Sequence, residues 1–192
     1  MTRLQWLDTH EGYGLLSRLL HWAMAALLGW QFLGMSCKLI LGRVPLSAFF
    51  VGTHAPLGLV LCVLIVLRLG WALLNRSCRP PHAMGRLGLA SRLGHLALYG
   101  LMLLVPVLAL LRHYGSGRAF EPFGLPLMAA TPDSKLETLV RLGNALHGEL
   151  AWLLLALIAG HVLMVLVHRF CWRDGVAARM LGPLHRSDRP TV

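Results

Sequence analysis

The sequence contains few charged side chains, and very few of these are acidic. Charged residues make up 14% of its 192 positions, and 8 Asp or Glu face 18 Lys or Arg. A soluble domain carries about a quarter charged residues, so the composition argues against a soluble globular protein. Hydrophobic residues reach 56% and gather into long runs, which is typical of an integral membrane protein.

Paired cysteine motifs are also missing. The four cysteines, Cys37, Cys62, Cys78 and Cys171, form neither C-x-x-C nor C-x-x-C-H. The sequence therefore gives no sign of a covalently attached c-type haem or of a cysteine zinc site. We expect no disulfide framework either, so a metal or cofactor site has to be built from other side chains.

The formal net charge of +10 raises the question of an acidic partner. Most Arg and Lys residues lie just outside the apolar runs and do not form a separate basic face, so we expect no nucleic acid as partner. Arg residues are concentrated between the second and third runs and in the C-terminal tail. Because basic loops stay on the cytoplasmic side, we predict that both termini are cytoplasmic.

Four apolar segments are each close to the roughly 20 residues that cross a bilayer. They cover residues 15–35, 48–74, 93–111 and 145–167. Pro56 and Pro106 interrupt two of them, which helices in a membrane bundle tolerate. We predict an all-α integral membrane four-helix bundle over residues 1–182 and a flexible cytoplasmic tail at 183–192. His21 lies inside the first segment, which favours a retained helix over a cleavable signal peptide.

The connection between the third and fourth segments, residues 112–144, is long for a helical bundle, so we expect it to be structured. Within it, Ser134-Lys135-Leu136-Glu137 has the spacing of a capping box. This pattern predicts that a helix starts there and runs into the fourth segment.

Histidines are unusually frequent in the apolar segments. Ionisable side chains inside a membrane are costly and usually functional. One such histidine is more often a hydrogen-bonded packing residue than a ligand, but that reading does not explain five. The five are His21, His54, His95, His147 and His161.

Spacing and depth arrange four of these histidines in pairs. His147 and His161 are 14 residues apart, which is close to four helical turns, so they share one helix face about 21 Å apart. Depth matches His161 with His21 near the cytoplasm, and His147 with His54 near the outer face. We therefore predict two histidine pairs, each of which joins the fourth span to another helix.

Pairs of histidines without softer ligands nearby suit a six-coordinate b-type haem. Zinc or copper is an alternative, although a structural zinc site normally has four protein ligands. Arg68 follows His54 by 14 residues, which places it at the depth of the inner haem, where it either pairs with a propionate or snorkels to the interface. His95 is an alternative partner for His161, a residue near a quinone pocket, or a structural residue.

At these positions the chain resembles the bacterial cytochrome b561 family of di-haem four-helix membrane proteins, over roughly residues 14–182. The likeness rests on Leu20-His21-Trp22, His54-x-x-x-Gly58 with Arg68, Gly94-His95, His147, Gly160-His161, and the segment from His168 to Asp174. The resemblance implies that His21, His54, His147 and His161 ligate two haem b groups. It also implies a bacterial inner-membrane location and electron exchange with ubiquinone.

Within that family, the segment Tyr114–Met128 is similar to the superoxide oxidase branch, which implies that superoxide at the outer face is the electron donor. Basic side chains near the outer haem would steer this anion, although ordinary interfacial charge is an equal alternative. The basic residues available are Lys38, Arg43, Arg112, Arg118, Lys135 and Arg141.

Quinone reduction also needs protons near the cytoplasmic margin. His95 and His168 could hydrogen-bond a quinone carbonyl and relay protons, with Trp172 covering the ring. The alternative is that this aromatic, basic helix end only anchors the protein at the interface. A different function is a cytochrome b subunit that carries electrons between a partner hydrogenase or dehydrogenase and quinone; a haem or metal transporter is more remote.

Overall fold

The computed structural model describes residues 5–80 and 85–182, so the predicted tail at 183–192 lies outside the described residues. Within them, four helices are long and apolar enough to cross a membrane, which confirms the all-α membrane bundle. The elements are α1 (Leu15–Leu41), α2 (Pro45–Leu74), α3 (Gly85–Gly115), the 3₁₀ turn η1 (Pro122–Gly124), α4 (Glu137–Leu166), the π-helical turn η2 (Val167–Trp172) and α5 (Ala178–Leu181).

The helices are longer than the apolar segments of the sequence. A helix rises about 1.5 Å per residue, so the 30 residues of α2 exceed the hydrocarbon core of about 30 Å. Both prolines, Pro56 and Pro106, lie inside continuous helices. Large apolar side chains such as Ile40 and Leu74 are about four-fifths exposed, which suits contact with lipid and not with water.

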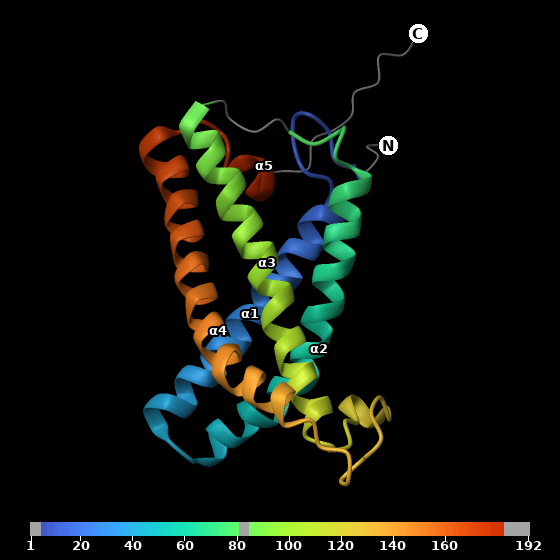
Figure 1. The fold of residues 1–192 in the computed structure, drawn as a ribbon. Helices are drawn as coiled ribbons and strands as arrows, with labels where there is room; N and C mark the ends of the chain where they lie inside the picture. The colour runs from blue at the N-terminus through green and yellow to red at the C-terminus, as the bar shows by residue number, and fades with distance from the viewer. Residues whose placement is uncertain (1–4, 81–84, 183–192) are drawn as a thin grey trace.

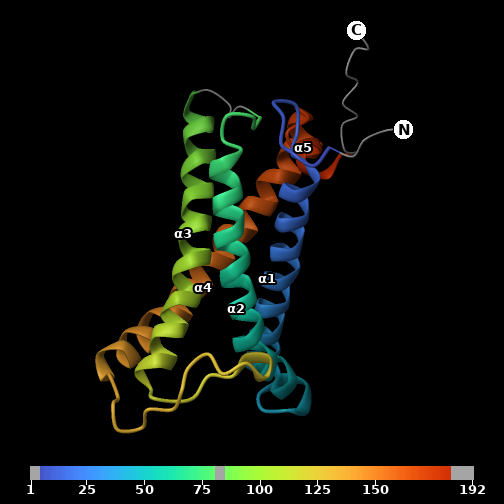
Figure 2. The same ribbon diagram turned by 90° about the vertical axis from the view of Figure 1, so that its right-hand side faces the viewer.

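The bundle consists of two helix pairs joined along one side. α1 packs along α2, α3 packs along α4, and α2 also contacts α3 (Figure 1). We call the two ends the α5 end, where α1 begins and α2 finishes, and the η1 end, where α4 begins. Figure 2 shows α4 leaning across the bundle, away from α1 at the η1 end and toward it at the α5 end.

The core lies at mid-height, where three helices meet. Met24 and Leu28 of α1 contact Leu61 and Ile65 of α2 and Leu154 of α4. Ile65 is fully buried and Leu154 is 3% exposed. Leu154 stands seven residues from both His147 and His161, so this core separates the two histidine levels of α4.

A buried carboxylate fixes the segment before α1. Asp8 accepts hydrogen bonds from the backbone N–H of Gly14 and from Nε of Arg79, both at 2.9 Å, and its side chain is fully buried. A Cβ at Gly14 would lie 2.5 Å from the backbone of Leu7, so the chain approaches itself too closely there for any other residue. The start of α1 is thereby tied to the connection between α2 and α3.

The connection between α3 and α4 is structured, as predicted. Its two sides are joined by a backbone bridge, in which the N–H of Phe120 donates to the carbonyl of Met128 at 2.9 Å. The His113 ring packs on Phe120 at 4.8 Å between centroids.

The capping box predicted at Ser134 is wrong: α4 begins at Glu137, and in the described structure no side chain caps it. The helix instead starts where the N–H of Leu136 is bound by the carbonyl of Gly115.

Candidate functional site

Four histidines form two pairs at different heights in the bundle. His21 of α1 and His161 of α4 have ring centroids 6.4 Å apart, with their planes at 69°. His54 of α2 and His147 of α4 have ring centroids 6.1 Å apart, with their planes at 82°. The structure thus brings together the partners that spacing and depth had matched, and α4 contributes one member to each pair.

These distances fit two imidazoles on opposite sides of one metal ion. A metal–imidazole nitrogen bond is about 2.0–2.1 Å long, so two donor nitrogens across a metal are roughly 4 Å apart and the ring centroids roughly 6 Å. A pair supplies two ligands and leaves the plane between the rings to other donors. A haem, whose porphyrin provides four in-plane nitrogens, meets that requirement.

The outer pair, at the η1 end, has two half-buried imidazoles. Nδ1 of His147 lies 2.9 Å from the carbonyl oxygen of Val105, which holds the proton on Nδ1 and leaves Nε2 free to ligate. Nδ1 of His54 is buried, and among the described residues it has no hydrogen-bond partner. A Cβ at Gly58, one turn beyond His54, would meet only the side-chain nitrogen of Gln31, at 3.5 Å, so no neighbouring backbone is packed against this glycine.

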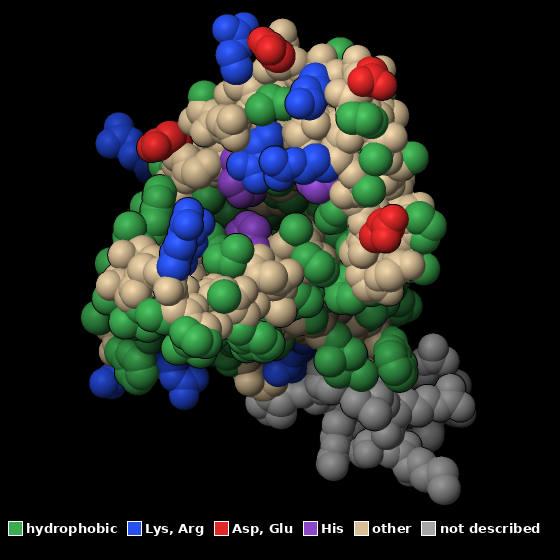
Figure 3. Space-filling view, turned by 90° about the horizontal axis from the view of Figure 1, so that it is seen from below, with side chains coloured by type: hydrophobic (Ala, Val, Ile, Leu, Met, Phe, Trp, Pro, Cys, Tyr) green, Lys and Arg blue, Asp and Glu red, His purple; other side chains and the backbone are tan. Residues whose placement is uncertain are grey.

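A hollow opens at the η1 end of the molecule. In Figure 3, histidine side chains are visible within it, and Lys and Arg side chains stand over it. Lys38 and Arg112 are near enough to add positive potential at His54. Arg112 is oriented by Asn144, whose side-chain oxygen accepts from its guanidinium at 3.3 Å.

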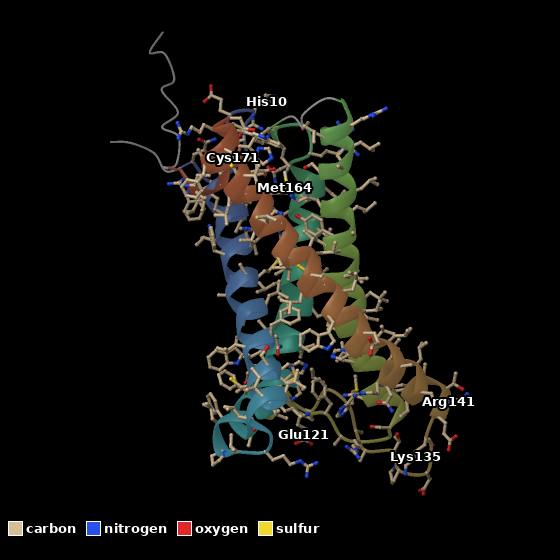
Figure 4. All side chains as sticks on the ribbon, turned by 90° about the vertical axis from the view of Figure 1, so that its left-hand side faces the viewer. His10, Glu121, Lys135, Arg141, Met164 and Cys171 are labelled. Atoms are coloured by element: carbon tan, nitrogen blue, oxygen red, sulfur yellow. The ribbon has the colours of Figure 1, made fainter. Side chains whose placement is uncertain are left out.

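Three other basic residues expected near the outer pair are elsewhere. Arg118, Lys135 and Arg141 line a separate cavity of about 550 Å³ between the ends of α3 and α4, together with Glu137. Figure 4 shows Lys135 and Arg141 at the outer edge of this side of the bundle. Five of the six predicted basic residues are therefore divided between the hollow and this cavity, and the sixth, Arg43, is exposed in the turn between α1 and α2.

The inner pair, at the α5 end, has an arginine close to it. Arg68 adds positive potential at His21 and His161. Its guanidinium donates to the Tyr99 hydroxyl at 3.1 Å and to the Ser17 carbonyl at 3.0 Å. Among the described residues no carboxylate lies within ion-pair distance of it, so the hydrogen-bond partners of this charge are neutral groups.

A third imidazole stands beside the inner pair. The His95 ring lies 5.4 Å from that of His161 between centroids, at 80°. Its Nδ1 is 2.7 Å from the backbone carbonyl of Ser91, one turn earlier in α3. This distance between ring centroids is shorter than the 6.1 and 6.4 Å of the two proposed pairs. His95 is therefore a direct neighbour of His161.

The π-helical turn η2 positions the remaining candidates. Nδ1 of His168 donates to Asp174 at 2.6 Å, and the His168 ring meets the edge of Trp172 at 4.7 Å between centroids. This hydrogen bond lowers the pKa of Asp174. Within the described part of the chain no contact joins His95 to His168 or Trp172, so the three proposed quinone residues do not form one cluster.

Two polar residues of the site were missed by the sequence reasoning. Gln31 and Tyr99 each contact a site residue, His54 and Arg68 respectively. Gln31 carries a signal in the sequence, because it is a strongly polar residue inside an apolar segment. Tyr99 carries none, since tyrosine is also common where it serves only packing.

Two comparisons with known proteins bear on this arrangement. A sequence model of the family described as prokaryotic cytochrome b561 matches residues 12–183. Cytochrome b561 homolog 2 of Escherichia coli (strain K12) is 30% identical over 186 residues, which cover 91% of this chain and 94% of that protein. The family match spans all four long helices.

Proposed function

The chain belongs to the prokaryotic cytochrome b561 family, whose members are integral membrane proteins that bind haem b and transfer electrons, and from this premise we propose that it carries electrons through two haems to ubiquinone. The donor in this proposal is superoxide at the periplasmic face of the bacterial inner membrane. The η1 end faces the periplasm and the α5 end the cytoplasm, as the Arg-rich loop and tail indicate.

The observation that carries the proposal is the pair of matched imidazole separations, 6.1 and 6.4 Å, on one shared helix. His54 and His147 would hold the outer haem, and His21 and His161 the inner one. When bound, each haem supplies a one-electron redox centre. The four imidazoles would hold the two haems at separate depths, with the apolar core between the two histidine levels.

Arg68 supports an inner haem on electrostatic grounds. A part-buried guanidinium that has no carboxylate partner is costly inside a membrane bundle. A haem propionate is an anion that would complete its coordination, in addition to the Tyr99 and Ser17 contacts. Snorkelling to the interface would not need these two hydrogen bonds.

The hollow at the η1 end supports a small anionic donor. Lys38 and Arg112 make the potential at the outer pair positive, and positive potential in a cleft raises the encounter rate of an anion. Superoxide gives up one electron there and leaves as O₂, so no protein acid or base is needed at this end.

Quinone reduction at the α5 end requires protons as well as electrons. His168 and Asp174 form a hydrogen-bonded pair beside Trp172, and such a pair can hold a proton for a quinone carbonyl. His95, whose ring contacts that of His161, would then serve the inner haem site and not this pair.

The proposal is tested by mixing purified, oxidised protein with a superoxide source and following haem absorbance. We expect fast haem reduction, and continuous turnover when a soluble ubiquinone is added, with superoxide dismutase as the control that abolishes both. Haem that stays oxidised under superoxide would reject this donor. If a hydrogenase or dehydrogenase then co-purifies and reduces the haem, the chain is a cytochrome b subunit of that enzyme.

A further inference from the structure

Gln31 faces the outer histidine from the neighbouring helix. Its side-chain nitrogen donates to the backbone carbonyl oxygen of His54 at 3.0 Å. A carbonyl oxygen only accepts hydrogen bonds, so this contact fixes which way the amide of Gln31 points. The amide oxygen, Oε1, is the end left free.

Two buried polar atoms at this position have no partner. Among the described residues, Oε1 of Gln31 and Nδ1 of His54 are the buried side-chain nitrogen and oxygen atoms that form no hydrogen bond. Buried polar atoms without partners are rare in folded proteins and call for a specific explanation. These two belong to residues already in contact, and one is an acceptor while the other becomes a donor when Nε2 of His54 binds a metal.

We propose that Gln31 is the positioning residue of His54: its Oε1 accepts the Nδ1 proton through one buried water that bridges these two atoms, and so aims Nε2 at the haem iron. The proposal rests on the outer haem proposed above. It gives His54 what His147 already has in the carbonyl of Val105, since ligating histidines generally donate their second N–H to an acceptor that fixes the ring and raises its basicity.

Helix packing does not account for Gln31. At the same level Trp30 donates to the Thr53 hydroxyl at 3.0 Å, and a Cβ at Gly34 would lie 2.8 Å from Phe50. α1 and α2 are therefore already held in register on both sides of Gln31. The polar amide is therefore explained by its two neighbours on His54, the backbone carbonyl oxygen and Nδ1.

The test is the midpoint potential of each haem in Gln31→Met, Gln31→Glu and the control Thr53→Val, measured by spectroelectrochemistry. An acceptor on Nδ1–H makes the imidazole a stronger donor to iron and favours the oxidised haem. Gln31→Met removes the acceptor and should raise the potential of the outer haem, whereas Gln31→Glu, with nearly the same shape, should lower it. The inner haem should not shift in either variant, and Thr53→Val should shift neither.

Two results would overturn the proposal. One is an outer haem whose potential is the same in Gln31→Met, Gln31→Glu and the parent protein. The other is a shift of equal size in both haems, which a general loosening of the bundle would produce. Failure of the underlying haem assignment looks different: the outer haem would survive in His54→Ala, whatever happens at Gln31.

Discussion

At the scale of single residues, the two histidine pairs differ in what holds their rings. His147 is fixed by a backbone carbonyl, whereas His161 lies between His21 and His95. A crowded pair can exchange one ligand for another, but an isolated pair cannot. The outer site is therefore where a single substitution gives the clearest result.

His147→Ala should remove the outer haem and leave the inner one, because no third imidazole stands beside His54 in the described contacts. We expect the haem content to fall to about half, measured by the pyridine haemochrome assay. His113→Ala is a matched control, since His113 lies at the same end but packs on Phe120. Loss of both haems in His147→Ala would mean that the pairing is wrong.

The sequence was sufficient to match these pairs because histidine depth follows directly from helix periodicity. A residue 14 places further along a helix returns to the same face, so His147 and His161 had to point the same way. Gln31 and the neutral contacts of Arg68 depend on how closely two helices approach. That approach is fixed by small residues such as Gly34 against Phe50, which a periodic pattern does not reveal.

At the scale of elements, the short segments around the helices carry specific polar contacts. The segment before α1 is held by Asp8, which is buried against Arg79, and Arg18 donates to the carbonyl of Gly182 beyond α5. The turn η2 brings His168 to Asp174. All of these lie at the α5 end, so polar contacts join the chain segments on the proposed quinone side.

Asp8→Ala should destabilise the protein by about 3 kcal/mol, because it leaves the Arg79 guanidinium without its buried partner. The loss should appear as a lower midpoint in thermal unfolding, followed through haem absorbance. Asp133→Ala, an exposed residue of the α3–α4 connection, should change the midpoint little. Equal stability of the two variants would show that the Asp8 contact is not needed for the fold.

The His168–Asp174 contact should give quinone reduction an acid limit. The hydrogen bond holds the pKa of Asp174 below its usual value, so the contact is complete above the ordinary carboxylate pKa and is lost as pH falls through the lowered one. Asp174→Asn should lower the quinone turnover and flatten its decline at acid pH, while superoxide-driven haem reduction stays unchanged. A pH profile identical to that of the parent would assign Asp174 to the interface only.

The sequence predicts the four long helices well, but it does not predict the residue at which α4 begins. The four long helices follow from apolar runs that only a membrane can accommodate. The local pattern predicted that α4 starts at Ser134, but the start is decided by the carbonyl of Gly115, 21 residues before Leu136, which accepts a hydrogen bond from the Leu136 N–H. Contacts between distant segments override local capping preferences, and a single sequence does not show them.

At the scale of the whole molecule, the basic side chains at the η1 end are divided between two places. The hollow at the η1 end has Lys38 and Arg112 near its histidines, while Arg118, Lys135 and Arg141 line a cavity at the edge of the bundle. Of these two groups, Lys38 and Arg112 are near enough to His54 to add positive potential there. The two groups can therefore be separated by experiment.

Lys38→Gln should slow the reaction with superoxide several-fold at low ionic strength, and the difference should shrink as salt is added, because screening acts on long-range attraction. Stopped-flow measurement of haem reduction gives both quantities. Lys135→Gln removes the same charge from the same face and should have a smaller effect. Equal effects of the two variants would indicate that the overall charge of the face matters and the hollow does not.

The most direct test of the bundle as a two-haem electron carrier is the haem content of the purified, full-length protein, together with its dithionite-reduced minus oxidised spectrum. The shared helix α4, with one histidine at each of two levels, predicts two haem b groups per chain with b-type absorption bands. A preparation that is folded and contains one haem, or none, would contradict it.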